Sequence, residues 1–323
     1  MRNLILYIIC LIFGGAGAWL VSGWGITLGL LDSANERSSH EGVVPKGGGI
    51  GILAAFFVCS IALCVPKSFW IPAVFISLIS LWGDRFEISH RKRLLFQFAA
   101  GVILSVGILQ ETEAAVAAYA LIPVFVVFVV GTANFFNFMD GINGIAGITG
   151  MVGFGLLSWF AVVQGADPRI ILLCVCICLA CLGFLPFNMP MARVFMGDTG
   201  SILLGFVFSG MVVWISSSFL DFVCAAAFLF TFYADELTTM TERLKNRESL
   251  MSAHRRHLYQ VLANEGNISQ WKISVGYGML QLVVGISIIL VKDIGSIAVI
   301  SMIVIYFFGF VELSFRFRRR FEN

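Results

Sequence analysis

A regular series of polar side chains interrupts the apolar chain in the stretch NFFNFMDGIN. Asn134, Asn137, Asp140 and Asn143 each follow the previous member by three residues, directly after the fifteen uncharged residues 119–133. On a helix, a three-residue step shifts a side chain by only ~60° around the axis, so neighbouring members share a flank. Carboxylate and amide oxygens at the end of an apolar segment suit a metal ion or the donors of a bound substrate.

Four further segments carry residue types that bind phosphates and metals. They are DSANERSSHEGVVPKGGGIG (32–51), GDRFEISHRKRLLFQ (83–97), VFMGDTGS (194–201) and HRRHLYQ (254–260). Gly-rich turns and helix N-termini present N–H groups to anions, and Arg and Lys clamp phosphate oxygens. Mg²⁺ is held in proteins by one or two carboxylates together with substrate phosphates. Asp84, Asp140 and Asp198 are therefore the candidate catalytic carboxylates, with Asp198 the leading metal ligand and Asp84 the next.

Each segment also has a simpler interpretation. Arg91–Arg93 could be a topology signal only, residues 46–49 a flexible turn, and 254–260 a solvated helix on anionic lipid. The Gly-Asp-Thr-Gly-Ser run could be a turn and N-cap, since Asp and Thr favour that position. The conjunction favours a site, because ionisable residues at membrane depth are costly and are by default functional.

The composition predicts an all-α, polytopic integral membrane protein. Hydrophobic residues make up 59% of the 323 and charged residues 12%, with a mean hydropathy of +0.93. A soluble domain usually carries about 25% charge. The apolar run from Leu4 to Leu31 is longer than a signal-peptide core and favours a first spanning helix. No basic motif of the kind that binds nucleic acid is found, so we expect no nucleic-acid partner, and one membrane-embedded domain over residues 1–323.

Eleven apolar segments are candidate transmembrane helices by length. They are roughly 4–24, 48–65, 69–82, 94–110, 115–135, 142–164, 169–186, 199–217, 219–234, 273–291 and 295–315. An odd number of spans places the two termini on opposite sides of the bilayer.

The basic residues indicate the orientation. Seventeen Lys and Arg fall in alternate loops and the C-terminal tail, and four fall on the other side. Positive residues mark the cytoplasmic side, which predicts a periplasmic N-terminus and a cytoplasmic C-terminus. The long loops 32–47, 83–93, 187–198 and 235–272 are then cytoplasmic, and all five polar segments meet at that face.

The eight cysteines lie mostly within apolar spans. Cys174, Cys176, Cys178 and Cys181 could be considered as metal ligands, but their spacing puts the thiols on different faces of one helix. No His or carboxylate is near them in the sequence. Cysteine as a small apolar packing residue is the better interpretation.

At these motifs the chain resembles the polyprenyl-phosphate N-acetylhexosamine-1-phosphate transferases of glycosyltransferase family 4. NFFNFMDGINGIAG and FMGDTGS together are highly specific to this family, and the first loop (Arg37, Ser38, His40 and 45–49) and HRRHLYQ fit too. The family includes the enzymes that start O-antigen and enterobacterial common antigen synthesis and the phospho-N-acetylmuramoyl-pentapeptide transferase. Asn143 resembles the O-antigen or capsule branch more than the peptidoglycan branch, where an Asp is usual.

One position departs from the family pattern. The family usually has paired aspartates near the end of the third helix, whereas this sequence reads Trp82-Gly83-Asp84-Arg85. Gly83 stands where the first Asp would be, and Asp84 alone remains. The departure puts the roles around Asp84 in doubt and keeps open a catalytically impaired family member with a regulatory role.

The resemblance implies a reaction and its participants. A UDP-N-acetylhexosamine would donate sugar-1-phosphate to undecaprenyl phosphate in the bacterial inner membrane, giving undecaprenyl-pyrophosphoryl-sugar and UMP. It implies Mg²⁺, with Mn²⁺ as the alternative, and leaves a homodimer open. The implied substrate-binding residues are Asn134, Asn137, Asn143, Arg37, Lys46, Arg93, His254, Arg255, Arg256 and His257.

A transporter or flippase of a phosphorylated substrate is the rival class. Transporters place their polar site near the bilayer midplane, on broken helices and between repeated halves. Here the polar residues gather at one face and no repeat is evident, so the sequence favours the transferase.

Overall fold

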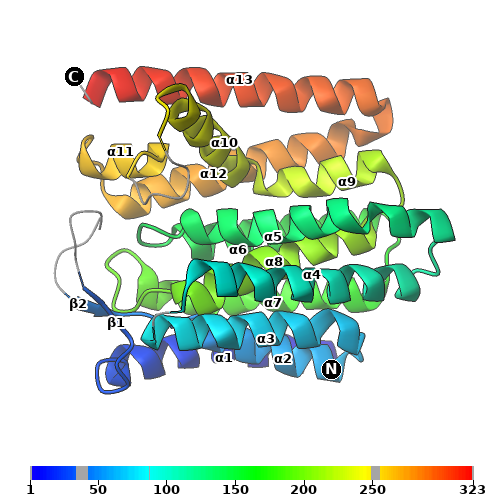
Figure 1. Ribbon diagram of the computed structural model, residues 1–323, viewed down its shortest axis with the longest axis horizontal. Helices are drawn as coiled ribbons and strands as arrows, with labels where there is room; N and C mark the ends of the chain where they lie inside the picture. Colours follow the sequence, from blue (N-terminus) through cyan, green and yellow to red (C-terminus); the bar gives the residue numbers. More distant parts are fainter. Residues whose placement is uncertain (1, 34–42, 87, 249–254, 322–323) are drawn as a thin grey trace.

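The protein is a bundle of long helices that run side by side along its longest axis (Figure 1). The computed structural model describes residues 2–33, 43–86, 88–248 and 255–321. The elements in chain order are α1 (Arg2–Trp24), β1 (Leu31–Ser33), β2 (Val43–Pro45), α2 (Ile50–Ala62), α3 (Lys67–Arg85), α4 (His90–Glu111), η1 (Val116–Leu121), α5 (Ile122–Phe138), α6 (Ile145–Val163), α7 (Pro168–Asn188), α8 (Gly197–Ile215), α9 (Phe219–Ala226), η2 (Ala227–Leu229), α10 (Phe230–Lys245), α11 (Leu258–Asn264), α12 (Gln270–Val291), η3 (Lys292–Ile294) and α13 (Ser296–Phe321).

The helical architecture confirms the predicted fold class. Among the described residues, eight helical segments are long and apolar enough to cross a membrane. The only strands described there, β1 and β2, form a short antiparallel hairpin in which Asp32 pairs with Val44. The chain is therefore an all-helical, multi-pass membrane protein. The N- and C-termini lie at opposite ends of the bundle (Figure 1).

The predicted count of eleven spans is not confirmed, because 48–65, 69–82 and 219–234 are not among these eight segments. The clearest departure is the last of the three. Residues 219–234 form two helices, α9 and α10, separated by the 3₁₀ turn η2. The second helix continues to Lys245, well into the segment expected to be a loop. In Figure 1, α10 crosses its neighbours obliquely. A run of apolar residues reports burial but not straightness, so the sequence could not distinguish one span from two helices at an angle.

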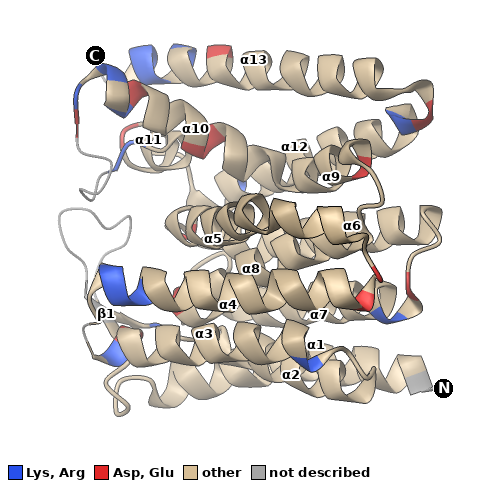
Figure 2. Cartoon of the chain, turned by 45° about the vertical axis from the view of Figure 1, so that its right-hand side comes forward, with Lys and Arg blue, Asp and Glu red and all other residues tan. Residues whose placement is uncertain are grey.

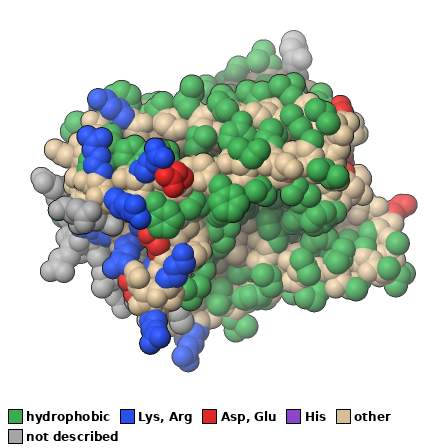
Figure 3. Space-filling view, turned by 90° about the horizontal axis from the view of Figure 1, so that it is seen from above, with side chains coloured by type: hydrophobic (Ala, Val, Ile, Leu, Met, Phe, Trp, Pro, Cys, Tyr) green, Lys and Arg blue, Asp and Glu red, His purple; other side chains and the backbone are tan. Residues whose placement is uncertain are grey.

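Helix α8 lies at the centre of the bundle. Every residue from Thr199 to Ile215 is buried, and α8 packs against α3 and α5. A helix that is apolar all round belongs in the interior, where each face has a partner. By contrast, α13 exposes large apolar side chains such as Ile297, Ile305 and Phe308. The broad apolar surface in Figure 3 shows the same character, with Lys and Arg gathered toward one end.

Candidate active site at the N-terminus of helix α8

Asp198 lies in the first turn of α8 and is held by side chains from two other helices. The Arg93 guanidinium of α4 lies 2.5 Å from Asp198 Oδ2. Asn137 of α5 donates from Nδ2 to Asp198 Oδ1 at 2.8 Å and to Ser201 Oγ at 2.9 Å. A carboxylate in the first turn is favoured by the positive end of the helix dipole. Asp198 keeps 28% of its side-chain surface exposed, so a ligand can reach it.

Asp84 reaches the same place from the end of α3. Its side chain is only 4% exposed, its Oδ1 lies 3.6 Å from Lys46 Nζ, and its Oδ2 accepts from Thr199 Oγ1 at 3.3 Å. Burial raises the pKa of Asp84 to about 6, and the negative charge of Asp198 adds to the rise, while Lys46 and Arg93 oppose it. Asp84, Asp198, Lys46, Arg93 and Asn137 are called the carboxylate cluster below.

The glycine-rich turn after β2 is bonded directly to the segment before α8. Gly48 N donates to Phe195 O and Gly49 N to Met196 O, both at 2.9 Å. Gly197 adopts a left-handed φ of +72°, and a Cβ there would lie 2.7 Å from Gly47 N and 2.9 Å from Asp84 Oδ2. Only glycine fits such a backbone position without strain. The two glycine motifs are therefore needed to bring Lys46 and Asp84 to Asp198.

The polar series of α5 divides between two places. Of its members, Asn137 joins the carboxylate cluster, whereas Asn134 donates to Gln97 Oε1 and to Val130 O, each at 2.7 Å. Helix α5 ends at Phe138, so the helical phase between neighbours holds for Asn134 and Asn137 and not for the later members.

The turn after α5 carries the other two members. Asn143 N donates to Gln270 Oε1 at 3.0 Å, and its Nδ2 donates to Pro190 O at 3.3 Å. Its Oδ1 is buried and has no hydrogen-bond partner among the described residues. Asp140 is half-buried in the same turn and lies near enough to Tyr259 to act on it electrostatically. The loop between α5 and α6 is thus tied to α12 and to the α7–α8 connection.

The described residues of the HRRHLYQ segment belong to a second group of polar side chains, which surrounds the start of α11. His254 and Arg37 lie outside the described residues. Arg255 pairs with Glu265 at 3.9 Å and Arg256 with Glu248 at 2.6 Å. His257 is the N-cap of α11, is 3% exposed, and faces Asp235 and Glu236 at 3.9 and 3.5 Å. Burial lowers the pKa of His257 to about 3, and the nearby Arg318 and Arg243 lower it further, so His257 is neutral at physiological pH.

Asp235, which the sequence analysis missed, is the centre of this second group. It is fully buried and accepts hydrogen bonds from Leu258 N at 2.8 Å, Tyr259 N at 3.3 Å and Tyr277 Oη at 2.7 Å. Asp235 therefore fixes the start of α11 against α10 and α12. The available signal was an Asp-Glu pair directly after the apolar run 219–234, because an ionisable residue at that depth is costly.

Helix α11 connects the second group to the loop after α5. Tyr259 Oη donates to Phe138 O at 3.1 Å, and a Cβ at Gly141 would lie 2.3 Å from that Oη. The close approach places α11 directly over the Met-Asp-Gly turn. Helix α11 therefore joins Asp235 to the residues that precede Asn143 through direct contacts.

The donor set of the carboxylate cluster fits a hard divalent cation. Carboxylates and hydroxyls are the oxygen ligands that Mg²⁺ prefers, and Asp84, Asp198 and Ser201 supply them here. The repulsion between Asp84 and Asp198, which contributes to the raised pKa of Asp84, is what a bound cation would relieve.

Charged side chains occupy the two ends of the bundle and leave its middle uncharged (Figure 2). The carboxylate cluster lies at the end that also holds β1, β2 and the C-terminus. Carboxylates interleaved with Lys and Arg at the end of a membrane bundle have the chemistry that phosphate groups and divalent cations require.

Known proteins resemble the chain over much of its length. The family model described as glycosyl transferase family 4 matches residues 67–216. The probable undecaprenyl-phosphate N-acetylglucosaminyl 1-phosphate transferase of Bacillus subtilis (strain 168) is 23% identical over 85% of this chain and 80% of its own length. The undecaprenyl-phosphate alpha-N-acetylglucosaminyl 1-phosphate transferase of Thermotoga maritima is 28% identical, over 80% and 81%. The phospho-N-acetylmuramoyl-pentapeptide-transferase of Staphylococcus saprophyticus is 32% identical over 42% and 43%.

Residues 67–216 are thus similar to glycosyl transferase family 4, in agreement with the resemblance that the motifs indicate. The resemblance seen in the motifs is thereby confirmed. The matched residues 67–216 include Asp84, Arg93, Asn137 and Asp198, but not Lys46 or α11.

Proposed function

We propose that the protein transfers N-acetylhexosamine-1-phosphate from a UDP-sugar to undecaprenyl phosphate. The observation that carries the proposal is the meeting of Asp84 and Asp198 with Lys46 and Arg93 at the N-terminus of the central helix. Three separate parts of the chain supply these side chains: the turn at Lys46, the segment from Asp84 to Arg93, and the start of α8. Their chemistry suits two phosphate-bearing substrates, and the relatives named above are transferases that act on undecaprenyl phosphate by name.

The reaction exchanges one phosphorus–oxygen bond for another. A phosphate oxygen of undecaprenyl phosphate forms a bond to the β-phosphorus of the UDP-sugar. The bond between that phosphorus and the oxygen bridging to the α-phosphorus breaks, and the bridging oxygen leaves with UMP. The acceptor phosphate is already largely dianionic at neutral pH, so a formal base is hardly needed. Phosphoryl transfer then asks mainly for positioning and charge neutralisation.

The residues of the carboxylate cluster divide these tasks. Asp198 and Asp84 would hold Mg²⁺, with Mn²⁺ the alternative, and a metal bound there would neutralise charge on the transferred phosphoryl group. Lys46 and Arg93 lie 3.6 and 2.5 Å from the two carboxylates and are placed to exchange these partners for phosphate oxygens. Asn137 holds Asp198 in place through its 2.8 Å hydrogen bond.

The second group of polar side chains, around the start of α11, would form the nucleotide-sugar side of the site. Asp140 and Asn143 lie in the turn under α11, and the unpartnered Oδ1 of Asn143 can accept a hydrogen bond from a substrate. Arg255 and Arg256 would contact the diphosphate by giving up their pairing with Glu265 and Glu248. His257 would act through the placement of α11, because it is buried against Asp235 and Glu236.

The site would open to the cytoplasm, where UDP-sugars are made. The carboxylate cluster lies at the end of the bundle that the excess of Lys and Arg assigns to the cytoplasmic side. We place the protein in the bacterial inner membrane, at the initiating step of an O-antigen or capsule-type polysaccharide. Asn143 in the Met-Asp-Gly-Ile-Asn motif supports that branch.

The interrupted helix between α9 and α10 does not favour the transporter alternative. Broken helices of transporters present polar groups to the substrate at mid-membrane. Here the break is made by Ala227, Phe228 and Leu229, which are buried and apolar. The described polar groups of the carboxylate cluster lie instead at the end of an unbroken helix, α8.

The test is UMP release by the purified protein in detergent, with undecaprenyl phosphate and a panel of UDP-N-acetylhexosamines. We expect UMP from one donor, dependent on both lipid and Mg²⁺, and lost in EDTA. Transport of an uncleaved substrate across vesicles without UMP would overturn the proposal in favour of the transporter. Folded protein that binds the UDP-sugar and releases no UMP would show an impaired family member.

The variant Gly83→Asp distinguishes an impaired family member from a protein that catalyses a different reaction or none. A Cβ at Gly83 would lie 3.8 Å from Ile88 Cδ1, an ordinary van der Waals contact, so a side chain can start there without a clash. If the natural chain is inactive only because this carboxylate is missing, the variant releases UMP from the same panel. If it is also inactive, the reaction itself is wrong.

A further inference from the structure

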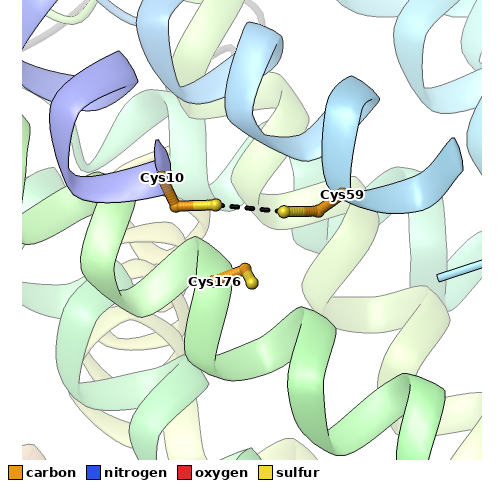
Figure 4. Close-up of side chains that lie close together, drawn as sticks. All are labelled: Cys10, Cys59 and Cys176. Atoms are coloured by element: carbon orange, nitrogen blue, oxygen red, sulfur yellow. Dashed lines mark hydrogen bonds between the residues drawn. The ribbon is translucent and has the colours of Figure 1, made fainter. Parts of the chain in front are cut away.

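Three thiols from three different helices meet inside the bundle, away from the carboxylate cluster (Figure 4). Cys10 of α1, Cys59 of α2 and Cys176 of α7 have their Sγ atoms within 4.8 Å of one another. The Sγ atoms of Cys10 and Cys59 are 3.0 Å apart. All three side chains are at most 1% exposed. These residues are called the thiol cluster.

Tight contacts between small residues hold the three helices at this separation. A Cβ at Gly14 of α1 would lie 2.0 Å from Ala180 O of α7, and one at Gly17 would lie 2.3 Å from Gly51 Cα of α2. Small residues at such crossings let membrane helices approach closely. Because the backbones are in contact, the thiols are carried by rigid elements and their separation is not a matter of side-chain flexibility alone.

We propose that Cys10, Cys59 and Cys176 form a binding site for a cuprous ion. Three sulfurs that each lie about 2.3 Å from one metal ion are roughly 4 Å apart, which the thiol cluster meets with small side-chain shifts. Soft thiolate ligands select soft metals, Cu(I) among them. No His or carboxylate joins the group among the described residues, so the donors are sulfur alone.

The surroundings favour a monovalent ion of low coordination number. The three cysteines belong to the hydrophobic core, where an uncompensated charge is costly. One thiolate neutralises Cu(I), so binding forms one Cu–S⁻ bond, releases one thiol proton to solvent, and leaves two thiols as neutral donors. Zn²⁺ usually takes four ligands, or three and a water, and the described cluster offers three within an apolar setting.

The bound ion would fasten α1 to the helices that support the candidate active site. Helix α2 begins directly after Gly49, which donates to Met196 O. Helix α7 ends at Asn188, whose Oδ1 accepts from Gly144 N at 2.7 Å. We therefore expect Cu(I) to raise the thermal stability of the protein.

The test is an anaerobic Cu(I) titration of the reduced, purified protein against a chromophoric Cu(I) chelator. We expect one equivalent retained per chain, with ultraviolet sulfur-to-copper charge-transfer absorption and a rise in melting temperature. The variant Cys10→Ala/Cys59→Ala/Cys176→Ala loses all three signals. The matched control Cys174→Ala/Cys178→Ala/Cys181→Ala removes three other cysteines of α7. This control should retain the bound copper, the charge-transfer absorption and the rise in melting temperature.

Two results would overturn the proposal. One is equal Cu(I) retention by the wild type and the first variant. The other is no retention by reduced protein in which all eight thiols are titratable after denaturation. If the triple variant does not fold, Cys176→Ala alone must weaken Cu(I) binding at least tenfold while Cys174→Ala does not.

Discussion

The two ends of the helical bundle use charged residues in different ways. At the end opposite the carboxylate cluster, Arg169 lies 2.7 Å from Glu111 and pairs with Asp167, and Lys292 lies 2.6 Å from Asp221. Glu111, Asp167 and Asp221 thus each have close cationic and hydrogen-bonding partners. In the carboxylate cluster, the cost of burying the charge of Asp84 exceeds the attraction of Lys46 and Arg93. A second carboxylate, Asp198, adds repulsion.

The pKa values of the two carboxylates express this difference. Burial tends to raise the pKa of Asp167, but the hydrogen bonds and charge of Arg169 outweigh it and the pKa falls below its usual 3.8. For Asp84, burial and the charge of Asp198 outweigh the attraction of Lys46 and Arg93, and the pKa rises to about 6. The ionised Asp167 therefore stabilises the fold, whereas the ionised Asp84 destabilises it. A group kept at a cost to stability is a candidate for function.

The largest expected effect is the loss of activity in Asp198→Asn. Removing the charge that anchors Arg93 and the proposed metal should lower the rate of UMP release by about 100-fold or more. The matched variant Glu111→Gln removes a carboxylate that pairs with Arg169 at the other end and should leave the rate unchanged. Similar losses in both variants would mean that the two ends do not differ in function.

The variants Gly197→Ala and Gly165→Ala compare the two ends of the bundle by the cost of placing an alanine at a left-handed backbone position. Both glycines have left-handed φ angles, +72° and +63°, where an alanine costs about 1–2 kcal/mol. At Gly165 nothing described lies within 4 Å of an added Cβ, whereas at Gly197 the Cβ would overlap Gly47 N and crowd Asp84. Thermal unfolding should show a larger loss of stability for Gly197→Ala, and UMP release should be lost there alone. Equal melting temperatures would contradict the close approach of the two glycine motifs.

The pH dependence should come from the carboxylate cluster. Because the folded pKa of Asp84 is raised from 3.8 to about 6, its folded state binds a proton that the unfolded chain lacks in this window. Stability should therefore fall as pH rises from 3.8 to about 6 and then level off. If the ionised form acts, UMP release rises over the same range.

Asp84→Asn supplies the control for this profile. The variant should lose both the fall in stability and the rise in rate near pH 6, measured by thermal unfolding and by UMP release. Asp167 has the opposite sign: its contribution is present above 3.8 and is lost as pH falls through its lower folded pKa. An unchanged profile in Asp84→Asn would assign the titration to another group.

The smallest expected effect is that of Asp167→Asn on stability. Its pairing with Arg169 is partly exposed, with 26% and 34% of the side-chain surfaces accessible, and such pairs contribute under about 1 kcal/mol. The asparagine can also keep the N-cap hydrogen bond from Arg169 N. A loss of several kcal/mol in the free energy of unfolding would show that the Asp167–Arg169 pair contributes more than a partly exposed ion pair.

Much of the candidate site could be predicted from residue types in their local context. Asp84 and Asp198 were selected as carboxylates at the ends of apolar helices, and Lys46 and Arg93 as basic residues that the family resemblance implies for phosphate binding. The structure brings all four together. Asn134 was grouped with Asn137 by spacing alone, yet it bonds to Gln97. Spacing along one helix defines a flank, but the neighbouring helix decides which residue of that flank meets which partner.

The sequence by itself determined the membrane class, most helices and the candidate carboxylates, because hydropathy and helix-end signals are local properties. Only the tertiary structure decided that Asp235 organises α11, that α9 and α10 are separate, and that Cys176 joins Cys10 and Cys59 and not the other cysteines of α7. These outcomes depend on how closely helices pack, and that is set by small residues in segments far apart in the sequence, such as Gly14 against Ala180.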